Sequence, residues 1–517
     1  MPTTIAIDPV TRIEGHARIT ITLDDQGRVE DCRLHVTQLR GFEAFCVGRP
    51  FAEMPSLTAR TCGICPVSHL LASAKACDEL LAVRIPPAAR LLRQLLNYGQ
   101  LVQSHALSFF HLASPDLLLG MDAAPEQRNL FGLAAARPEV AKDGIALRRF
   151  GQQLIERLAG KRIHPDWVVP GGVSRPLSRE TAAAIRAELP AMLTAAQNNL
   201  ERLQEVLPNF TAEIAHFANF PSGYLALAGE AGRLEYYDGP LRLVDQQGRE
   251  LFNEPEALHY HRHLAEQSEP DSYLKSPYYR PLGPDDGLYR VGPLARLNAA
   301  ASCGTPRADQ ALAGFKELAP GGPVTSSFHY HYARLIEIIH GLEKIELLLA
   351  DDTIYDPRVR ATAGANAPEG VGICEAPRGT LIHHYQIDEQ GRISAVNMVI
   401  ATGHNSLAIQ QGLQQAARAF INGDPGDNTG SEGPAGTGEK RGQSGGATVG
   451  EIGENGNIRE GLLNRIEAVL RCYDPCLSCS THALGQMPLA VELRRPGGEL
   501  IGQLTRDNDK VESKLTA

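Results

Sequence analysis

The stretch RTCGICPVSH, residues 60–69, carries two cysteines, Cys62 and Cys65, separated by two residues. Near the other end of the chain, DPCLSCSTH, residues 474–482, repeats this spacing with Cys476 and Cys479. Two intervening residues let both sulfurs of a pair reach one centre, and four such sulfurs form a soft thiolate ligand set. If both pairs serve one site, the two ends of the polypeptide must meet, so these stretches decide the fold.

Spacing alone leaves three interpretations of the two pairs open. A structural zinc site uses four cysteines, but its pairs are normally separated by a loop of about 15–20 residues. Each pair could instead form a redox disulfide, although neither lies in a thioredoxin-like βαβ context. The third interpretation is a catalytic metal centre built from both ends of the chain.

Composition excludes some functions. The net charge of −10 argues against a nucleic-acid ligand, which needs a basic surface. No apolar run approaches the about 20 residues of a membrane span, and the N-terminus has no secretory signal pattern. We therefore expect a cytoplasmic protein with reduced thiols, unless a partner carries an export signal. The other cysteines are expected to pack as small apolar residues: Cys32, Cys46, Cys77, Cys303, Cys374 and Cys472.

Hydrophobic patterns indicate a helix-rich α+β fold, with a core of long helices beside an N-terminal antiparallel sheet and smaller α/β parts. Residues 3–38 alternate apolar and polar side chains around a DDQG turn, which predicts the sheet. A proline start and helical apolar spacing predict a long helix from Pro86. Further helices are predicted near 126–160, 179–217, 325–350, 406–421 and 457–473.

Two hairpins are also predicted, at LRLVDQQGRELF (241–252) and within LIHHYQIDEQGRISAVNMVIATG (381–403). Between them and the last helix, residues 422–458 are glycine-rich and polar, which predicts a disordered surface insertion. The chain has no strand–GxGxxG–helix pattern, so it shows no sign of binding NAD itself.

The residues around the cysteines carry a resemblance. RxCGICxxxH and DPCxxCxxH are similar to the two signatures of nickel–iron hydrogenase large subunits. Among these, LRGFEAF, HHYQIDEQG and GMDAAPEQRN (120–129) look most like the large subunit of cytoplasmic, bidirectional, NAD-reducing enzymes. Further similar segments run in order along the chain: DPVTRIEGH (8–16), LRGFE (39–43), PGGV (170–173), VGPLARLN (291–298), ARLIEIIH (333–340), EAPRGTLIHHY (375–385) and THALGQMPL (481–489).

The resemblance implies a nickel–iron centre for reversible cleavage of dihydrogen, with carbon monoxide and cyanide on the iron. All four cysteines would bind nickel, and Cys65 and Cys479 would also bridge to iron. Dihydrogen is apolar and barely acidic, so a metal must polarise it as a Lewis acid while a base takes the proton. The resemblance assigns that base to the Cys476 thiolate.

Further residues are given roles by the same resemblance. Glu14 matches the carboxylate that relays the proton outward. Arg378 matches the arginine over the open metal position, near one cyanide, and Thr402 the hydroxyl that donates to the other. Membrane-bound relatives have an acidic residue where this chain has Ser104, which leaves open whether Arg378 has a carboxylate partner.

A structural magnesium is implied beside the centre. Its ligands would be Glu43, the backbone carbonyl of Met398 and His482, with waters completing the shell. Glu337 would accept hydrogen bonds from those waters. His69 is interpreted as an orienting partner of the thiolates rather than as a ligand.

Beyond His482 the chain continues to Ala517, and the resemblance implies that an endopeptidase cuts between His482 and Ala483 after nickel insertion. Residues 1–482 would then be the large-subunit domain and 483–517 a propeptide. The other cysteines lack iron–sulfur spacing. Electrons must therefore leave through an iron–sulfur small subunit, and by resemblance through a flavin (FMN) and NAD-binding diaphorase; a maturation chaperone is also implied. Alternatives are another acceptor (deazaflavin, sulfur/NADP or a disulfide reductase) or a non-turnover hydrogen sensor.

Overall fold

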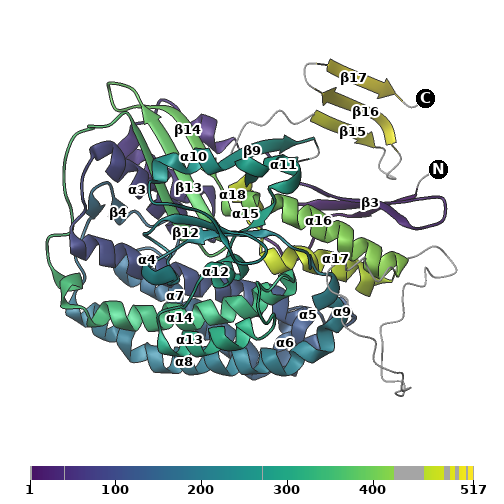
Figure 1. Cartoon of the computed structure of the whole chain (residues 1–517), viewed down its shortest axis with the longest axis horizontal. Coiled ribbons are helices and arrows are strands. Elements are labelled where there is room, and N and C mark those ends of the chain that lie inside the picture. Colours follow the sequence, from purple (N-terminus) through teal and green to yellow (C-terminus); the bar gives the residue numbers. More distant parts are fainter. Residues whose placement is uncertain are drawn as a thin grey trace.

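The computed structural model describes residues 3–39, 41–270, 272–423 and 459–481, and the strand backbones of 489–494, 500–507 and 510–515. Long helices lie side by side in one half of the molecule, and small sheets cover them in the other (Figure 1). The predicted helix-rich α+β architecture is therefore confirmed. The predicted insertion falls almost wholly on 424–458, outside the described residues.

Four long helices make the bundle: α4 (Pro87–Ala106), α7 (Pro138–Ala159), α8 (Arg179–Val206) and α14 (Tyr330–Ala350). Proline occupies the first turn of α4 and α7, where a missing backbone N–H costs no hydrogen bond. Helix α14 is buried along nearly its whole length, because α4, α8 and the short helix α13 (Pro306–Lys316) all pack against it.

Two predicted helices are shorter than the sequence pattern suggested. The run 126–160 is divided into α6 (Leu130–Ala136) and α7, because Pro138 starts a new helix and Arg137 before it is not helical, with φ −141° and ψ 66°. The run 179–217 is interrupted after Val206 at a 3₁₀ turn containing Pro208. Both breaks are caused by proline.

The predicted N-terminal sheet is confirmed as β1 (Thr3–Ile7), β2 (Arg18–Leu23) and β3 (Val29–His35), all antiparallel. Two further sheets contain the predicted hairpins. One has the order β11-β6-β7-β8, with β11 parallel to β6, and the other has the order β12-β13-β14. Their strands are β6 (Gly223–Leu227), β7 (Leu241–Val244), β8 (Glu250–Glu254), β11 (Tyr289–Arg290), β12 (Glu369–Ala376), β13 (Gly379–Ile387) and β14 (Ile393–Val399).

Helix α3 (Pro66–Leu81) lies directly on β12, and two glycines allow the close approach. A Cβ at Gly372 would lie 2.0 Å from the carbonyl oxygen of Ala72. A Cβ at Gly370 would lie 2.3 Å from that of Ala76. This contact fixes the start of α3, which carries the first cysteine pair, against the central sheet.

The C-terminal part returns to the same place through α16 (Ser406–Ala417), α17 (Glu460–Tyr473) and α18 (Leu477–Ser480). Helix α17 packs against α16, and α18 against α15 (Ala401–His404). Shorter elements are α1 (Phe42–Cys46), α2 (Met54–Thr58), α5 (Ser114–Leu119), β4 (Val168–Val169), β5 (Gly172–Val173), α9 (Thr211–His216), α10 (Tyr260–His263), β9 (Leu264–Glu269), β10 (Ser272–Tyr279), α11 (Gly283–Asp286) and α12 (Pro293–Ala299).

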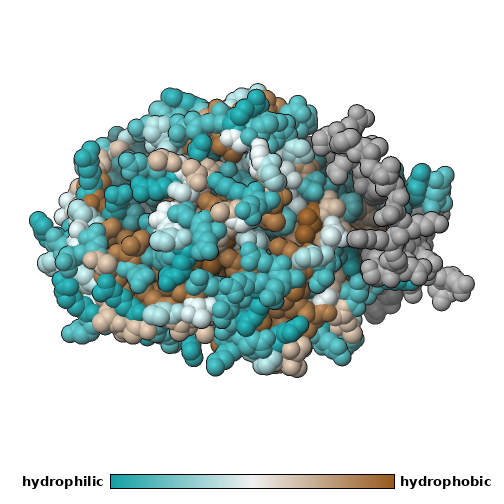
Figure 2. All heavy atoms as spheres, turned by 60° about the horizontal axis from the view of Figure 1, so that its bottom comes forward, coloured by the Kyte–Doolittle hydropathy of each residue, from teal (hydrophilic) through white to brown (hydrophobic). Residues whose placement is uncertain are grey.

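The tail beyond residue 488 contains an antiparallel meander of backbone strands, β15 (Leu489–Arg494), β16 (Leu500–Asp507) and β17 (Lys510–Leu515). The surface of the bundle side is mostly polar with scattered apolar patches (Figure 2). Among the described residues, no helix combines the length and the apolar character that crossing a bilayer requires.

Candidate metal centre

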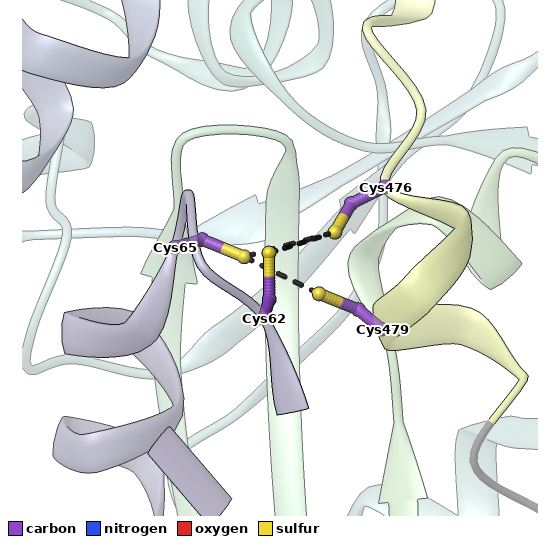
Figure 3. A group of neighbouring side chains, drawn as sticks. All are labelled: Cys62, Cys65, Cys476 and Cys479. Carbon is purple, nitrogen blue, oxygen red and sulfur yellow. Dashed lines mark hydrogen bonds between the residues drawn. The ribbon is translucent and has the colours of Figure 1, made fainter. Parts of the chain in front are cut away.

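The four paired cysteines meet at one point between the sheet and the C-terminal helices (Figure 3). Cys62 and Cys65 come just before α3, and Cys476 and Cys479 lie at the start of and within α18. The Sγ–Sγ distances are 3.2 Å for Cys62–Cys476, 3.3 Å for Cys65–Cys479 and 3.9 Å for Cys65–Cys476. All four sulfurs lie within 4.8 Å of one another and are buried. The structure thus brings together the residues that the sequence singled out.

The chemistry of this cluster fits a group of metal ions. Burial raises the pKa of the Cys476 and Cys479 thiols well above the usual value. Hydrogen bonds with Cys476, Cys479 and Cys62 lower the pKa of Cys65. Without a cation, the cluster therefore favours one thiolate held by neighbouring thiols. Four thiolates in so small a buried space need cations to compensate their charge, and soft sulfur ligands suit nickel and iron.

Glu14 lies beside the second cysteine pair, because its strand-like segment pairs in parallel with Cys476. The Leu477 amide donates to the Glu14 carbonyl at 3.1 Å, and the Ser478 amide donates to Glu14 Oε2 at 3.1 Å. Gly15 permits this approach, since its φ is +89° and a Cβ there would lie 2.7 Å from that of Leu477. The N-terminal RIEG segment thus holds the loop that carries Cys476.

Thr402 holds the same loop from the opposite element. Its Oγ1, on α15, accepts a hydrogen bond from the buried backbone amide of Cys476 at 2.9 Å. Because that bond uses a lone pair of the oxygen, the hydroxyl proton stays available for a second partner. The position predicted for Thr402 therefore coincides with the cysteine cluster.

Arg378 has a carboxylate partner that was not predicted from the sequence. Its guanidinium, at the turn between β12 and β13, donates to the Asp474 carbonyl through Nε at 2.5 Å. Its Nη2 lies 3.1 Å from Oδ1 and 3.0 Å from Oδ2 of the Asp474 carboxylate. Asp474 was visible in the quoted motif DPCLSC, two residues before Cys476. The sequence did not indicate which positively charged side chain would pair with that carboxylate.

Ser104 contributes only a weak contact, since Arg378 Nη1 lies 3.4 Å from its hydroxyl. The acidic residue that relatives place there is therefore not needed to pair Arg378. Burial by itself would lower the pKa of Arg378, but Asp474, Cys476, Cys65 and Cys62 together raise it well above the usual value. Arg378 is consequently a permanent positive charge facing the thiol cluster.

Glu337 lies in a buried ion network on the bundle side of Arg378. Both of its oxygens accept hydrogen bonds from Arg296, each at 2.7 Å, and Oε2 also contacts His105 at 2.7 Å. Burial would raise the pKa of Glu337, but Arg296 and His105 lower it to about 2. Arg296 continues the network to Glu375, three residues before Arg378. If Glu337 accepts hydrogen bonds from magnesium-bound waters, as predicted, the same oxygens must also keep their bonds to Arg296 and His105.

His69 lies one helical turn after Cys65, on α3, and is one of the groups that lower the pKa of the Cys65 thiol. Its Nδ1 lies 3.1 Å from Nε2 of His383 on β13. This position suits the role predicted for His69, an orienting partner of the thiolates. His383 was given no special role from the sequence.

Two of the three predicted magnesium ligands lie together. Glu43, on α1, accepts a hydrogen bond from the Met398 amide at 2.7 Å, where β14 passes α1. Burial raises the pKa of Glu43 to about 7. A nearby cation would favour its charged form. The third predicted ligand, His482, and the predicted cleavage position at Ala483 lie outside the described residues.

The remaining cysteines are buried, as predicted for packed thiols. Burial raises the pKa of four of them, Cys32, Cys46, Cys374 and Cys472, to about 12. Thiols with such values are poor nucleophiles and poor metal ligands. Within the described part of the chain, the paired cysteines are the only group of three or more His, Cys, Asp or Glu side chains that could hold one metal ion.

Comparison with known families decides the identity. The model described as nickel-dependent hydrogenase matches residues 40–128 and 228–417, and one described as HoxL-like matches residues 4–39. A curated relative that is 38% identical covers 97% of this chain. The chain belongs to the nickel-dependent hydrogenase family.

That relative is subunit beta of the NAD-reducing hydrogenase HoxS of Cupriavidus necator, and 99% of its length is covered. A chain of the F420-non-reducing hydrogenase vhu of Methanocaldococcus jannaschii is 41% identical over 81% of this chain and 99% of its own. A crystal structure of NAD⁺-reducing [NiFe]-hydrogenase in the H₂-reduced state is 42% identical, with a TM-score of 0.83 over 93% of this chain and 99% of its own. This hydrogenase chain is therefore the catalytic subunit of a nickel–iron enzyme, with the fold of the large subunits.

Proposed function

We propose that this hydrogenase subunit cleaves and forms dihydrogen at a nickel–iron centre held by Cys62, Cys65, Cys476 and Cys479, and that its electrons reach NAD(P). The convergence of the four sulfurs supports the centre. Cys65 and Cys479 would be shared with iron, and carbon monoxide and cyanide would complete the iron. When bound, the metals supply Lewis acidity and accept the electron pair of dihydrogen.

The residues around the centre would manage the proton. The Cys476 thiolate accepts it from dihydrogen, because it lies within the cluster and directly beside Glu14. The Glu14 carboxylate, half-buried and bonded to the Ser478 amide, then takes it toward solvent. This transfer is general acid–base catalysis by two positioned groups.

Arg378 and Thr402 would stabilise the ligands of the iron. Arg378 places a buried positive charge beside the sulfurs, and its pairing with Asp474 orients the guanidinium plane. Such a preorganised donor stabilises anionic groups without any reorganisation during the reaction. The free hydroxyl proton of Thr402 supplies a second donor.

A structural magnesium would be held by Glu43, the Met398 carbonyl and His482, since carboxylate and carbonyl oxygens suit this hard ion. Residues 483–517 would be a propeptide, cut between His482 and Ala483 by an endopeptidase after a chaperone has assisted nickel insertion. The comparison of molecular mass before and after nickel loading tests this: the mature subunit should end at His482.

The NAD(P) acceptor is supported by the relative of 38% identity, whose name is NAD-reducing and whose length this chain matches almost completely. Partners would be a flavin- and NAD-binding diaphorase and an iron–sulfur small subunit, in the cytoplasm. A second candidate, an acceptor other than NAD(P) and F420 such as a disulfide, has its own support, because relatives named F420-non-reducing hydrogenase reach 42% identity.

The test is purification of the mature complex from its native host. Metal analysis should find nickel and iron near one to one, and infrared spectra should contain bands of iron-bound carbon monoxide and cyanide. Zinc without nickel would refute the hydrogenase centre. Dihydrogen-dependent reduction should be faster with NAD⁺ or NADP⁺ than with a disulfide acceptor, and the opposite order would select the second candidate.

A further inference from the structure

A buried chain of hydrogen-bonding side chains leads away from Cys65 into the contact between α3 and β13. His69 Nδ1 lies 3.1 Å from His383 Nε2, and His383 Nδ1 lies 2.5 Å from the hydroxyl of Tyr385. The Tyr385 hydroxyl in turn lies 2.9 Å from that of Ser73. We infer that Tyr385 and His383 are positioning residues, which orient His69 so that its remaining ring nitrogen donates a hydrogen bond to Cys65.

The secondary structure explains why these four residues line up. His69 and Ser73 are one helical turn apart on α3, and His383 and Tyr385 are two residues apart on β13, so each pair lies on one face. Helix α3 is pressed onto the neighbouring strand β12 at Gly370 and Gly372. The chain therefore lies in a tight contact in which the rings cannot turn freely.

The number of protons on each ring determines which group donates in each of these hydrogen bonds. A metal-bound thiolate at Cys65 accepts hydrogen bonds, so the nitrogen of His69 that faces it must carry the proton. The other nitrogen, Nδ1, must then accept from His383 Nε2–H, because a neutral imidazole has one donor and one acceptor. His383 Nδ1 is consequently an acceptor as well. The hydroxyl of Tyr385 is then the donor that sets both tautomers, and because it has a single proton, the Ser73 hydroxyl must donate to its oxygen.

The outer end of the chain argues against a route for protons to solvent. His69, Ser73, His383 and Tyr385 are all at most 1% exposed. The buried hydroxyl of Thr58, a further polar group near this end, donates its proton to the Met54 carbonyl at 2.8 Å. A backbone carbonyl cannot pass a proton onward. The chain is therefore suited to orientation, as for groups that hold metal-ligating side chains in other proteins.

This inference rests on the proposed function, in which Cys65 is a metal ligand. The test compares Tyr385→Phe with two controls in the mature complex. Tyr385→Phe removes the donor to His383 and keeps the ring. Ser73→Ala removes only a contact at the outer side of the phenol, and Tyr332→Phe removes the hydroxyl of another tyrosine, which accepts from Gln204 between α14 and α8.

We expect Tyr385→Phe to shift or split the infrared bands of the loaded centre and to lower dihydrogen turnover per bound nickel by about 10- to 100-fold. Ser73→Ala and Tyr332→Phe should keep the wild-type bands and turnover, since Tyr385 still donates in both. Unchanged bands in Tyr385→Phe would overturn the inference. An equal shift in Ser73→Ala would also overturn it, because general loosening of the contact would then be the cause.

Nitrogen-15 NMR of histidine-labelled protein reads the imidazole tautomers without relying on the metals. The wild type should contain His69 with Nε2–H and His383 with Nε2–H, and Tyr385→Phe should alter both signals. The opposite wild-type tautomers would overturn the inference. Wild-type protein that lacks nickel and the infrared bands would refute the proposed function, and the tautomer measurement would still decide the role of Tyr385.

Discussion

The two cysteine pairs reach the same point in different ways. Cys62 and Cys65 are attached to α3, a helix of 16 residues that is buried almost throughout and pressed onto β12. Cys476 and Cys479 sit on α18, which has only four residues. The second pair is held by polar contacts from three other segments of the chain, through Glu14, Thr402 and Arg378.

This difference indicates that the first cysteine pair is fixed by packing of the core, whereas the second pair is held by separate polar contacts. Apolar packing around α3 is formed as the domain folds, so the first pair is in place without any metal. The loop of the second pair depends on individual hydrogen bonds, each worth about 1 kcal/mol, and on one buried ion pair. We therefore expect the second half to open separately, which would suit metal insertion.

The largest effect should come from removing a sulfur of the second pair. Cys476→Ala should abolish dihydrogen turnover, because it removes both a proposed nickel ligand and the proposed proton acceptor. Cys303→Ala is the matched control, since Cys303 is an equally buried cysteine outside the cluster. Dihydrogen oxidation and nickel content of the purified complex check this. Substantial turnover in Cys476→Ala would refute the role of its thiolate.

The next effect tests the ion pair that holds the second half. Asp474→Asn leaves the buried Arg378 without a carboxylate and should destabilise the closed loop by about 3–5 kcal/mol. Asp122→Asn removes an exposed carboxylate from Arg465, which keeps its buried partner Glu213, and should cost less than about 1 kcal/mol. Hydrogen exchange of the amides of residues 476–481 in metal-free protein measures the difference. Equal exchange in both variants would mean that the pair does not hold the loop.

Much of the molecule could be predicted from local sequence patterns. Proline starts and apolar spacing located the long helices, and turn residues located the hairpins. The cysteine spacing indicated the paired cysteines as a site, and the residues that flank them carried the resemblance to a nickel–iron centre. The errors in helix length, at Pro138 and after Val206, arose because apolar spacing continued across prolines that end a helix.

The partners of the site residues could not be predicted in the same way. Asp474 lies next to a signature cysteine, but its pairing with Arg378 depends on how the β12–β13 turn meets the end of α17. His383 pairs with His69 only because β13 lies beside α3. The two contacts join residues that are 96 and 314 positions apart, and no local pattern encodes them.

A smaller effect is expected at Thr402. Thr402→Val removes the acceptor for the buried Cys476 amide and should favour loop opening by about 1–3 kcal/mol, whereas Thr402→Ser keeps the oxygen and should resemble the wild type. Exchange of the Cys476 amide in metal-free protein reports this directly. If Thr402→Val opened no more readily than the wild type, the hydrogen bond from the Cys476 amide would not hold the loop.

The smallest expected effect distinguishes unfolding of the core from opening of the loop, because only the first should depend on the protonation of His340. Burial lowers the pKa of His340, on α14, to about 3, compared with about 6.5 in the unfolded chain. Below pH 6.5 the unfolded chain therefore binds a proton at His340, whereas the ring stays neutral in the folded chain. The contribution of His340 to the free energy of unfolding is therefore fully present above pH 6.5 and is progressively lost as the pH falls toward 3. At pH 6 this single histidine should lower the free energy of unfolding by about 0.8 kcal/mol.

His340→Asn removes this titration, so global unfolding of the variant should lose less stability than the wild type between pH 8 and pH 6. Opening of the loop at residues 476–481 does not require exposure of His340, which contacts Thr305 within the bundle. Its opening free energy should therefore depend on pH equally in both proteins. Denaturant unfolding and amide exchange at the two pH values measure the two quantities. A matching change in both would mean that core and loop open together, and the two halves of the site would then be one cooperative unit.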